Sequence, residues 1–158
     1  MKALTLTQPW ATLVAIGAKT IETRSWGTSF RGSLAIHAAR KFPEDARDLA
    51  FNDAGFSVPL HEAGYVYEWQ LPLGAIVAVC EVKEVRRILG WQYLIEEADW
   101  PVERAVAEEE FGNYQPGRYA WHLASIRRLP KPIPCRGALG LWDVPAEIVE
   151  QLRAEAST

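Results

Sequence analysis

The sequence reads Gly17-Ala-Lys19-Thr-Ile-Glu22-Thr-Arg24-Ser-Trp26 across the ten residues that decide its fold. Glycine at position 17 suits the left-handed residue that closes a helix, so we expect a β-strand to begin at about Lys19. Side chains alternate between the two faces of a strand, which places Glu22, Arg24 and Trp26 on the same face. The stretch therefore predicts the end of a helix followed by a strand that carries a carboxylate and a guanidinium side by side.

Polar and aromatic residues border this strand in the sequence. Gln8 and Trp10 precede it, and His37 follows it. A surface strand can carry charges without any function. These neighbours nevertheless favour a strand that forms one wall of a polar pocket.

The composition is that of a globular protein. Of 158 residues, 49% are hydrophobic and 23% are charged, which favours one folded domain over a disordered chain. No apolar run approaches the roughly 18 residues that span a bilayer, and the N-terminus lacks the basic-then-apolar pattern of a secretory signal. We therefore expect a single domain over residues 1–158, located in the cytoplasm and without membrane contact.

Charge is unevenly distributed along the chain. The formal net charge is −3 and the pI about 5.7, which argues against indiscriminate nucleic-acid binding. Residues 1–41 nevertheless carry six basic side chains and one acid, a net charge of +5 that leaves −8 for the rest of the chain. Such a split is consistent with one basic concave face on an acidic protein, although it also arises by chance.

Metal and cofactor binding are not indicated by the sequence. Cys80 and Cys135 are far apart, and together with the three histidines they do not show zinc-ligand spacing. We expect both cysteines to be reduced thiols in or near the core, and we expect neither a metal nor a cofactor.

Periodicity and turn residues predict six or so short strands and several helices. The expected strands cover residues 2–6, 19–26, 33–38, 75–82 with an extension to 88, 118–123 and 137–142, and the expected helices cover 10–16, 43–54 and 145–154. Between them, 56–73 is expected to be a long surface connection, and 129–134 an extended segment in which three prolines remove ladder donors. This order predicts an α+β fold, a small and mostly antiparallel β-barrel with flanking helices, although periodicity does not establish that the barrel closes.

Residues 91–112 form an acidic segment. They contain seven acids and one base. We expect a helical, solvated insertion that takes no part in chemistry. A further functional alternative is a protein-interaction domain that uses this segment as its contact surface.

Several segments together resemble the ASCH domain family, a member of the PUA-like superfamily. The hallmark of that family is the spacing found here in Gly17, Lys19, Glu22 and Arg24. Matching segments span roughly residues 3–142 and look like a bacterial and phage-like branch of the family.

The resemblance implies a PUA-like β-barrel with a cleft over the motif and a role in binding RNA or another nucleic acid. Some members look enzymatic: one group hydrolyses acetylated cytidine nucleosides with a lysine, a threonine and a glutamate, and another member is reported as a ribonuclease. Carried over by position, the lysine falls on Lys19 and the glutamate on Glu81, whereas Glu22 occupies the threonine position. That departure puts the amidohydrolase mechanism in doubt.

The first functional hypothesis is that a basic, aromatic-lined cleft binds RNA or a nucleoside or nucleotide. Bases require aromatic side chains for stacking and a few fixed donors and acceptors, and phosphates require cations, among which Lys41 is a further candidate. The candidate ligand-binding residues are Gln8, Trp10, Lys19, Glu22, Arg24, Trp26, Arg31, His37, Arg40, Tyr119 and Trp121. Each aromatic residue can instead pack in the core, and His37 can be a hydrogen-bonded structural residue.

The alternative hypothesis is a hydrolase that acts on a modified nucleoside or on RNA. Its catalytic candidates are Lys19, Glu22 and Glu81, since a lysine desolvated between two carboxylates can activate water or polarise a carbonyl. The same charges can also form an ion-pair network that braces the barrel without turnover. Sequence alone leaves the three possibilities open.

Overall fold

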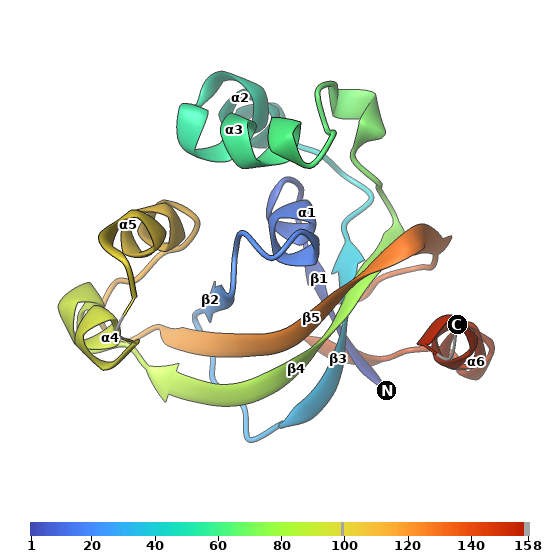
Figure 1. Ribbon diagram of the computed structural model, residues 1–158. Helices are drawn as coiled ribbons and strands as arrows, with labels where there is room; N and C mark the ends of the chain where they lie inside the picture. The colour runs from blue at the N-terminus through green and yellow to red at the C-terminus, as the bar shows by residue number, and fades with distance from the viewer. Residues whose placement is uncertain (99, 157–158) are drawn as a thin grey trace.

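The computed structural model describes residues 1–98 and 100–156 (Figure 1). Its strands are β1 (Lys2–Leu6), β2 (Ile21–Arg24), β3 (Gly32–Ala38), β4 (Ala75–Arg87), β5 (Tyr119–Pro134) and β6 (Leu141–Asp143). Its helices are α1 (Trp10–Ala15), α2 (Glu44–Asn52), α3 (Ala54–Glu62), the 3-10 turn η1 (Glu68–Gln70), α4 (Trp91–Ala98), α5 (Val102–Glu110) and α6 (Ala146–Ala156). None of the helices in these ranges is long and apolar enough to cross a membrane.

The strands form one sheet in the order β2-β5-β4-β3-β1-β6. Only β1 and β3 pair in parallel among these neighbours, and the other pairings are antiparallel. The long strands β4 and β5 bend strongly, so the sheet curls around α1 as a half-barrel (Figure 1). The expected α+β fold with a mostly antiparallel, barrel-like sheet is confirmed, with β2 and β6 as the two edges of the curled sheet.

Helix α1 fills the concave side of the sheet. Every side chain from Ala11 to Ala15 is buried, and Val14 packs with Leu4, Ile36 and Trp121 in the central core. Gly17 follows with φ of 78°, a left-handed conformation that costs glycine little. The helix end that the sequence predicts therefore forms as expected, and it delivers the chain to β2.

Helix α6 packs on the opposite face of the sheet. Ala3 and Ala35 pair in register on neighbouring strands, and their side chains join Leu152 of α6 in a second core. The alternating residues Leu4 and Ile36 belong to the central core on the α1 side. This two-sided burial explains why the strands carry apolar residues at consecutive positions.

The prediction of a long surface connection over 56–73 is wrong for its first part. Residues up to Glu62 form α3, in which Phe56 and Leu60 lie one turn apart and pack against Leu13 of α1. The helix expected over 43–54 ends at Asn52, and the N–H of Gly55 donates to the side chain of Asp53 at the start of α3. A glycine and a proline within nine residues argue against a helix in the sequence, but tertiary packing stabilises this helix.

The proline-rich segment 129–134 is extended, as expected, but it also continues β5. Ile133 pairs with Ile76 and Pro134 with Ala75 at the end of the ladder. Ladder pairing therefore reaches further than the prolines suggest, and it holds the end of β5 against the start of β4.

The acidic segment 91–112 is helical, as expected, over α4 and α5, while its member Asp99 lies outside the described residues. The expectation that it is solvated is wrong for its inner face. Leu94 packs with Ile21 of β2, and Glu108 is only 1% exposed. The segment is part of the core that supports β2.

Candidate ligand-binding site

The start of β2 is held by a buried ammonium group. Lys19 is 1% exposed, and its Nζ donates hydrogen bonds to the carbonyls of Ile21 and Phe111, the latter at 3.1 Å. Phe111 is the C-cap of α5, where a cation also interacts favourably with the helix dipole. The ammonium lies 3.6 Å from Oε2 of Glu22. Lys19 therefore joins β2, the end of α5 and the carboxylate of Glu22.

Glu108 makes the reciprocal connection from α5 to β2. Its carboxylate accepts hydrogen bonds from the backbone N–H of Thr20, at 2.9 and 3.0 Å, and of Ile21, at 2.8 Å. The hydroxyl of Thr20 also donates to it, at 3.0 Å. Sequence reasoning missed Glu108, which looked like one more acid on a solvated helix. Its one distinguishing signal was its helical spacing, three residues after Ala105 and three before Phe111, both of which are apolar.

Glu22 and Arg24 lie on one face of β2, as the alternation predicts. The Nε of Arg24 donates to Oε1 of Glu22 at 2.9 Å, and an Nη2 hydrogen donates to the carbonyl of Thr5 at 2.9 Å. Nη1 of Arg24 has no acceptor among the described residues, and the side chain is 24% exposed. The carboxylate is therefore fixed by two cations, while the guanidinium keeps donors that face solvent.

A cavity of about 390 Å³ opens above this pair. Glu22, Arg24, Trp10 and Trp26 line it together with Arg118. A smaller hollow of about 320 Å³ shares Trp10 and Glu22 and extends toward the end of α5. We call these two adjoining hollows the motif pocket. Its volume lies within the roughly 300–1,000 Å³ of small-ligand sites.

The indoles at the motif pocket are held by aromatic neighbours. Trp26 stands edge-on against Trp121, with ring centroids 4.9 Å apart, and Trp10 stands edge-on against Phe56 at 5.9 Å. Trp10 and Trp26 are both half-buried, so part of each ring remains exposed. Fixed, partly exposed indoles are suited to stacking against a flat ligand.

Arg118 was not among the predicted site residues. Its Nε donates to the carbonyl of Asn113 at 3.1 Å and its Nη2 to the carbonyl of Thr23 at 3.5 Å. These bonds place a second guanidinium at the pocket wall. Arg118 is the first residue of the strand expected over 118–123, next to Tyr119, which pairs with Arg24 in the structure.

Four predicted residues are not exposed in the motif pocket. Gln8 is fully buried, because its amide bonds both the N–H of Thr12 and the carbonyl of Pro72. Trp121 lies wholly in the core beneath Trp26, and Tyr119 covers Gly27, where a Cβ would lie 2.6 Å from the ring. These residues support the walls of the pocket, as does the buried Lys19.

Arg31 is exposed on a neighbouring turn. Its Nη1 donates to the carbonyls of Thr28 and Phe30, at 3.1 and 2.7 Å. It does not line the motif pocket.

His37 and Arg40 line a second and larger cavity, of about 1090 Å³, which we call the basic cavity. Lys41 and Arg136 also line it, and the half-buried Cys135 lies at its wall. None of its lining residues is acidic among those that the structure describes. The structure thus divides the basic residues expected in one cleft between two cavities.

His37 is bonded through both ring nitrogens. Nε2 lies 2.9 Å from the carbonyl of Cys135 and therefore carries a hydrogen, and Nδ1 lies 3.2 Å from the hydroxyl of Thr5. Burial lowers the pKa of His37, an effect only partly opposed by the bond to Cys135. The Thr5 hydroxyl also donates to the carbonyl of Ala138 at 3.1 Å, so its one hydrogen is shared between that carbonyl and Nδ1 of the neutral ring. The bond from Nε2 to Cys135 sets the tautomer.

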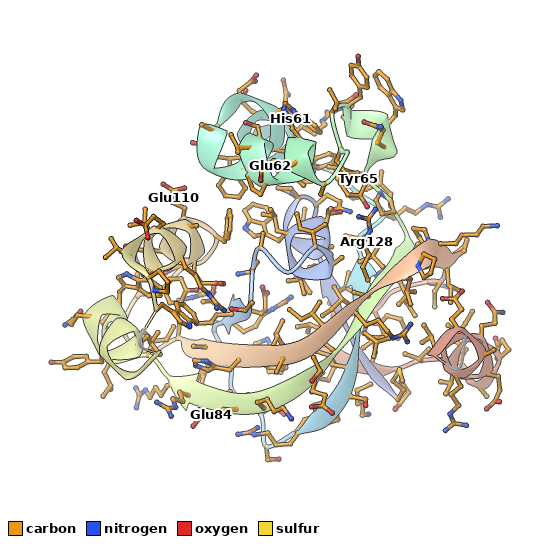
Figure 2. The ribbon with its side chains drawn as sticks, in the orientation of Figure 1. His61, Glu62, Tyr65, Glu84, Glu110 and Arg128 are labelled. Atoms are coloured by element: carbon orange, nitrogen blue, oxygen red, sulfur yellow. The ribbon has the colours of Figure 1, made fainter. Side chains whose placement is uncertain are left out.

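Glu81 is not brought to Lys19 and Glu22. It pairs with Ala124, next to the pairing of Val82 with the core residue Leu123, so Glu81 faces away from α1. Its carboxylate lies 2.5 Å from the ammonium of Lys83, which lowers its pKa. Glu84, farther along β4, likewise lies on the side away from α1 (Figure 2).

The cysteines do not contribute a metal site. Cys80 is buried, and burial raises the pKa of its thiol to about 12. Within residues 1–98 and 100–156, no three His, Cys, Asp or Glu side chains gather as a metal-binding group.

Comparisons with known proteins relate most of this chain to one family. The model of the ASCH domain family matches residues 4–133. Among solved structures, the ASCH protein of Zymomonas mobilis aligns over 97% of this chain and 93% of that chain, at 14% identity and a TM-score of 0.53. A tyrosine-to-phenylalanine variant of that protein aligns over 97% and 96%, at 12% identity and a TM-score of 0.55. At these identities the likeness concerns the fold alone. No curated protein matches the chain.

Proposed function

Because this chain belongs to the ASCH domain family, we propose that the motif pocket binds single-stranded RNA or a nucleotide-like ligand. The family belongs to the PUA-like superfamily and is associated with RNA binding. One observation carries the proposal for this chain: Arg24, Glu22 and two partly exposed indoles line one cavity.

Each of these groups matches a part of a nucleotide. The exposed indole surfaces of Trp10 and Trp26 suit base stacking, which contributes about 1–3 kcal/mol per base. The carboxylate of Glu22 accepts hydrogen bonds from an exocyclic amine of a base. The guanidinium of Arg24, with donors still unpaired, suits a phosphate or a carbonyl oxygen of the base.

Lys19 and Glu108 act on the ligand through Glu22. Lys19 is buried and fully bonded, so it fixes the carboxylate of Glu22 without lining the cavity. Glu108 fixes the backbone from which Glu22 projects. The motif thus divides into residues that hold β2 and residues that face the ligand.

Fluorescence anisotropy with a fluorescein-labelled eight-nucleotide single-stranded RNA tests the proposal. We expect binding that weakens with salt, and a loss of about tenfold or more in Arg24→Ala, because a charge-assisted contact is removed. Lys2→Ala is the matched control, since it removes the same charge from the far end of β1, where Lys2 pairs with Asp143. Near-ultraviolet circular dichroism checks that each variant is folded. Absence of binding at low salt, or equal affinities of the two variants, would refute the proposal.

The hydrolase alternative receives less support from the geometry. It requires Lys19 between Glu22 and Glu81, and Glu81 instead pairs with Lys83 on the other face of the sheet. Mass spectrometry of acylated cytidines and of RNA after incubation with the protein decides it. A product that forms with the wild type and not with Glu22→Ala would favour an enzyme that uses a different set of residues.

A further inference from the structure

We propose that the basic cavity binds the phosphate backbone of the same nucleic acid whose base occupies the motif pocket. The inference rests on the proposed function and narrows it. The ligand is then a single strand of two or more nucleotides, and a free nucleoside fills only half of the site.

The basic cavity is lined by positive charges that have no acidic partner within the described part of the chain. Arg40 and Lys41 follow β3, and Arg136 follows β5, so cations from two separate segments converge on one cavity. None of the three forms an ion pair with an acidic side chain among the described residues. In contrast, Lys2 and Arg47 on other surfaces are paired with acids, at 3.0 and 3.7 Å. Unpaired cations around a hollow without acids suit a polyanion.

The loop of residues 136–139 lines the basic cavity. Backbone N–H groups of residues 136–139 donate to no acceptor among the described residues, and this leaves donors beside Arg136 for an anion. Gly137 lets this backbone approach the ring of His37: a Cβ there would lie 2.5 Å from its Cε1 and 2.9 Å from Oγ1 of Thr5. The loop thus packs directly on His37.

The part of the basic cavity formed by Leu73 and Gly74 is held in place by its neighbours. Leu73 and Gly74 line the cavity, and the carbonyl of the preceding Pro72 accepts a hydrogen bond from the buried amide of Gln8 at 2.8 Å. Earlier in the chain, the ring of Tyr65 lies under the guanidinium of Arg128, at 4.9 Å from the ring centre (Figure 2). The segment that leads to Leu73 and Gly74 is thus held at Tyr65 and again at Pro72, directly before the two lining residues.

The two cavities share one lining residue. Thr5 lines both of them. Its carbonyl accepts from Arg24 on the motif side, and its hydroxyl contacts His37 on the basic side. Thr5 is thus the residue that the two cavities share, and the proposal requires a bound strand to pass over it from the motif pocket to the basic cavity.

The experiment compares ligands of different length. A nucleoside is titrated by tryptophan fluorescence and the eight-nucleotide RNA by anisotropy, at several salt concentrations, with wild type, Lys41→Ala, Arg136→Ala, Arg24→Ala and the control Lys2→Ala. We expect Lys41→Ala and Arg136→Ala each to weaken RNA binding about tenfold and to reduce the log–log salt slope by about 0.7, with nucleoside binding unchanged. Arg24→Ala should weaken both ligands.

Separate outcomes identify which proposal fails. If Lys41→Ala and Arg136→Ala bind RNA as Lys2→Ala does, while Arg24→Ala still loses both ligands, the basic cavity is not a phosphate site and the proposed function stands. If neither ligand binds the wild type, both proposals are refuted. Inorganic pyrophosphate, followed by amide chemical shifts, is the independent probe. We expect shifts at Gly137 and Ala138, and shifts there with an unchanged RNA salt slope would indicate an anion site unrelated to nucleic acid.

Discussion

The carboxylate of Glu108 caps the start of β2 through Thr20, a residue 88 positions earlier in the chain, with hydrogen bonds from both its N–H and its hydroxyl. Lys19, directly before Thr20, forms a second bond between the same two elements, because its Nζ donates to the carbonyl of Phe111 at the end of α5. Helix α5 and the start of β2 therefore hold each other in place through one buried acid and one buried base.

Glu108→Gln should lower the free energy of unfolding by about 2–3 kcal/mol. An amide cannot accept all the bonds from Thr20 and Ile21, so buried N–H donors lose partners. Urea denaturation measures the change. The neighbouring Glu109 is exposed, so Glu109→Gln is the control and should change stability by less than about 0.5 kcal/mol. Equal effects would show that Glu108 is not a structural cap.

Lys19→Met should destabilise the fold by about 3 kcal/mol, because it leaves buried carbonyl acceptors and the carboxylate of Glu22 without the ammonium. The thermal midpoint measures this effect. Lys83→Met is the control, since Lys83 forms an exposed ion pair. A Lys19 variant with wild-type stability and lost ligand binding would instead place the ammonium in contact with the ligand.

Gly137→Ala should destabilise the protein by about 1–3 kcal/mol, because the new methyl group overlaps His37 and Thr5. Chemical denaturation gives the size of the change. Leu139→Ala tests the same loop without a clash, since Leu139 is 98% exposed. Unchanged stability in Gly137→Ala would mean that the loop moves away from His37 at little cost.

Stability should fall as the pH decreases through the ordinary histidine range. Burial lowers the pKa of His37 and of His122 below the ordinary histidine value, so the unfolded chain takes up protons more readily than the folded chain. The histidine contribution is complete above about pH 6.5 and is lost as the pH falls toward the lowered pKa. Arg40, Lys41 and Arg136 line the same cavity as His37.

Urea titrations at pH 7.5 and 5.5 measure this loss. His37→Gln should show a smaller loss between the two pH values than the wild type. A two-dimensional NMR titration in which the His37 ring protonates at or above 6.5 would contradict the expected direction.

Glu22→Gln should change which bases bind more than it changes stability. The carboxylate is an acceptor only, whereas an amide is both donor and acceptor. We therefore expect the wild type to favour bases with an exocyclic amine, such as cytosine, over uracil, and the variant to lose most of that preference. Anisotropy with oligocytidine and oligouridine measures the ratio, and an unchanged ratio would place the base elsewhere.

Local patterns predicted the parts of the fold that local chemistry determines. Gly17 closes α1, and alternation along β2 puts Glu22 beside Arg24, because both features depend on neighbours within a few residues. The role of Glu108 was not visible, since its partners at Thr20 and Ile21 are distant in sequence. For the same reason, the sequence placed the basic residues in one cleft, whereas the fold divides them between two cavities that meet at Thr5.

The mutual capping of α5 and β2 limits how the acidic segment can be studied. Excising 91–112 to look for a protein partner would also remove Glu108 and Phe111, and so it would unseat the strand that carries Glu22 and Arg24. Reversing the charge of outward-facing acids such as Glu103 and Glu109 leaves that scaffold intact. In this chain, the helical insertion is therefore part of the structure that supports the binding strand β2.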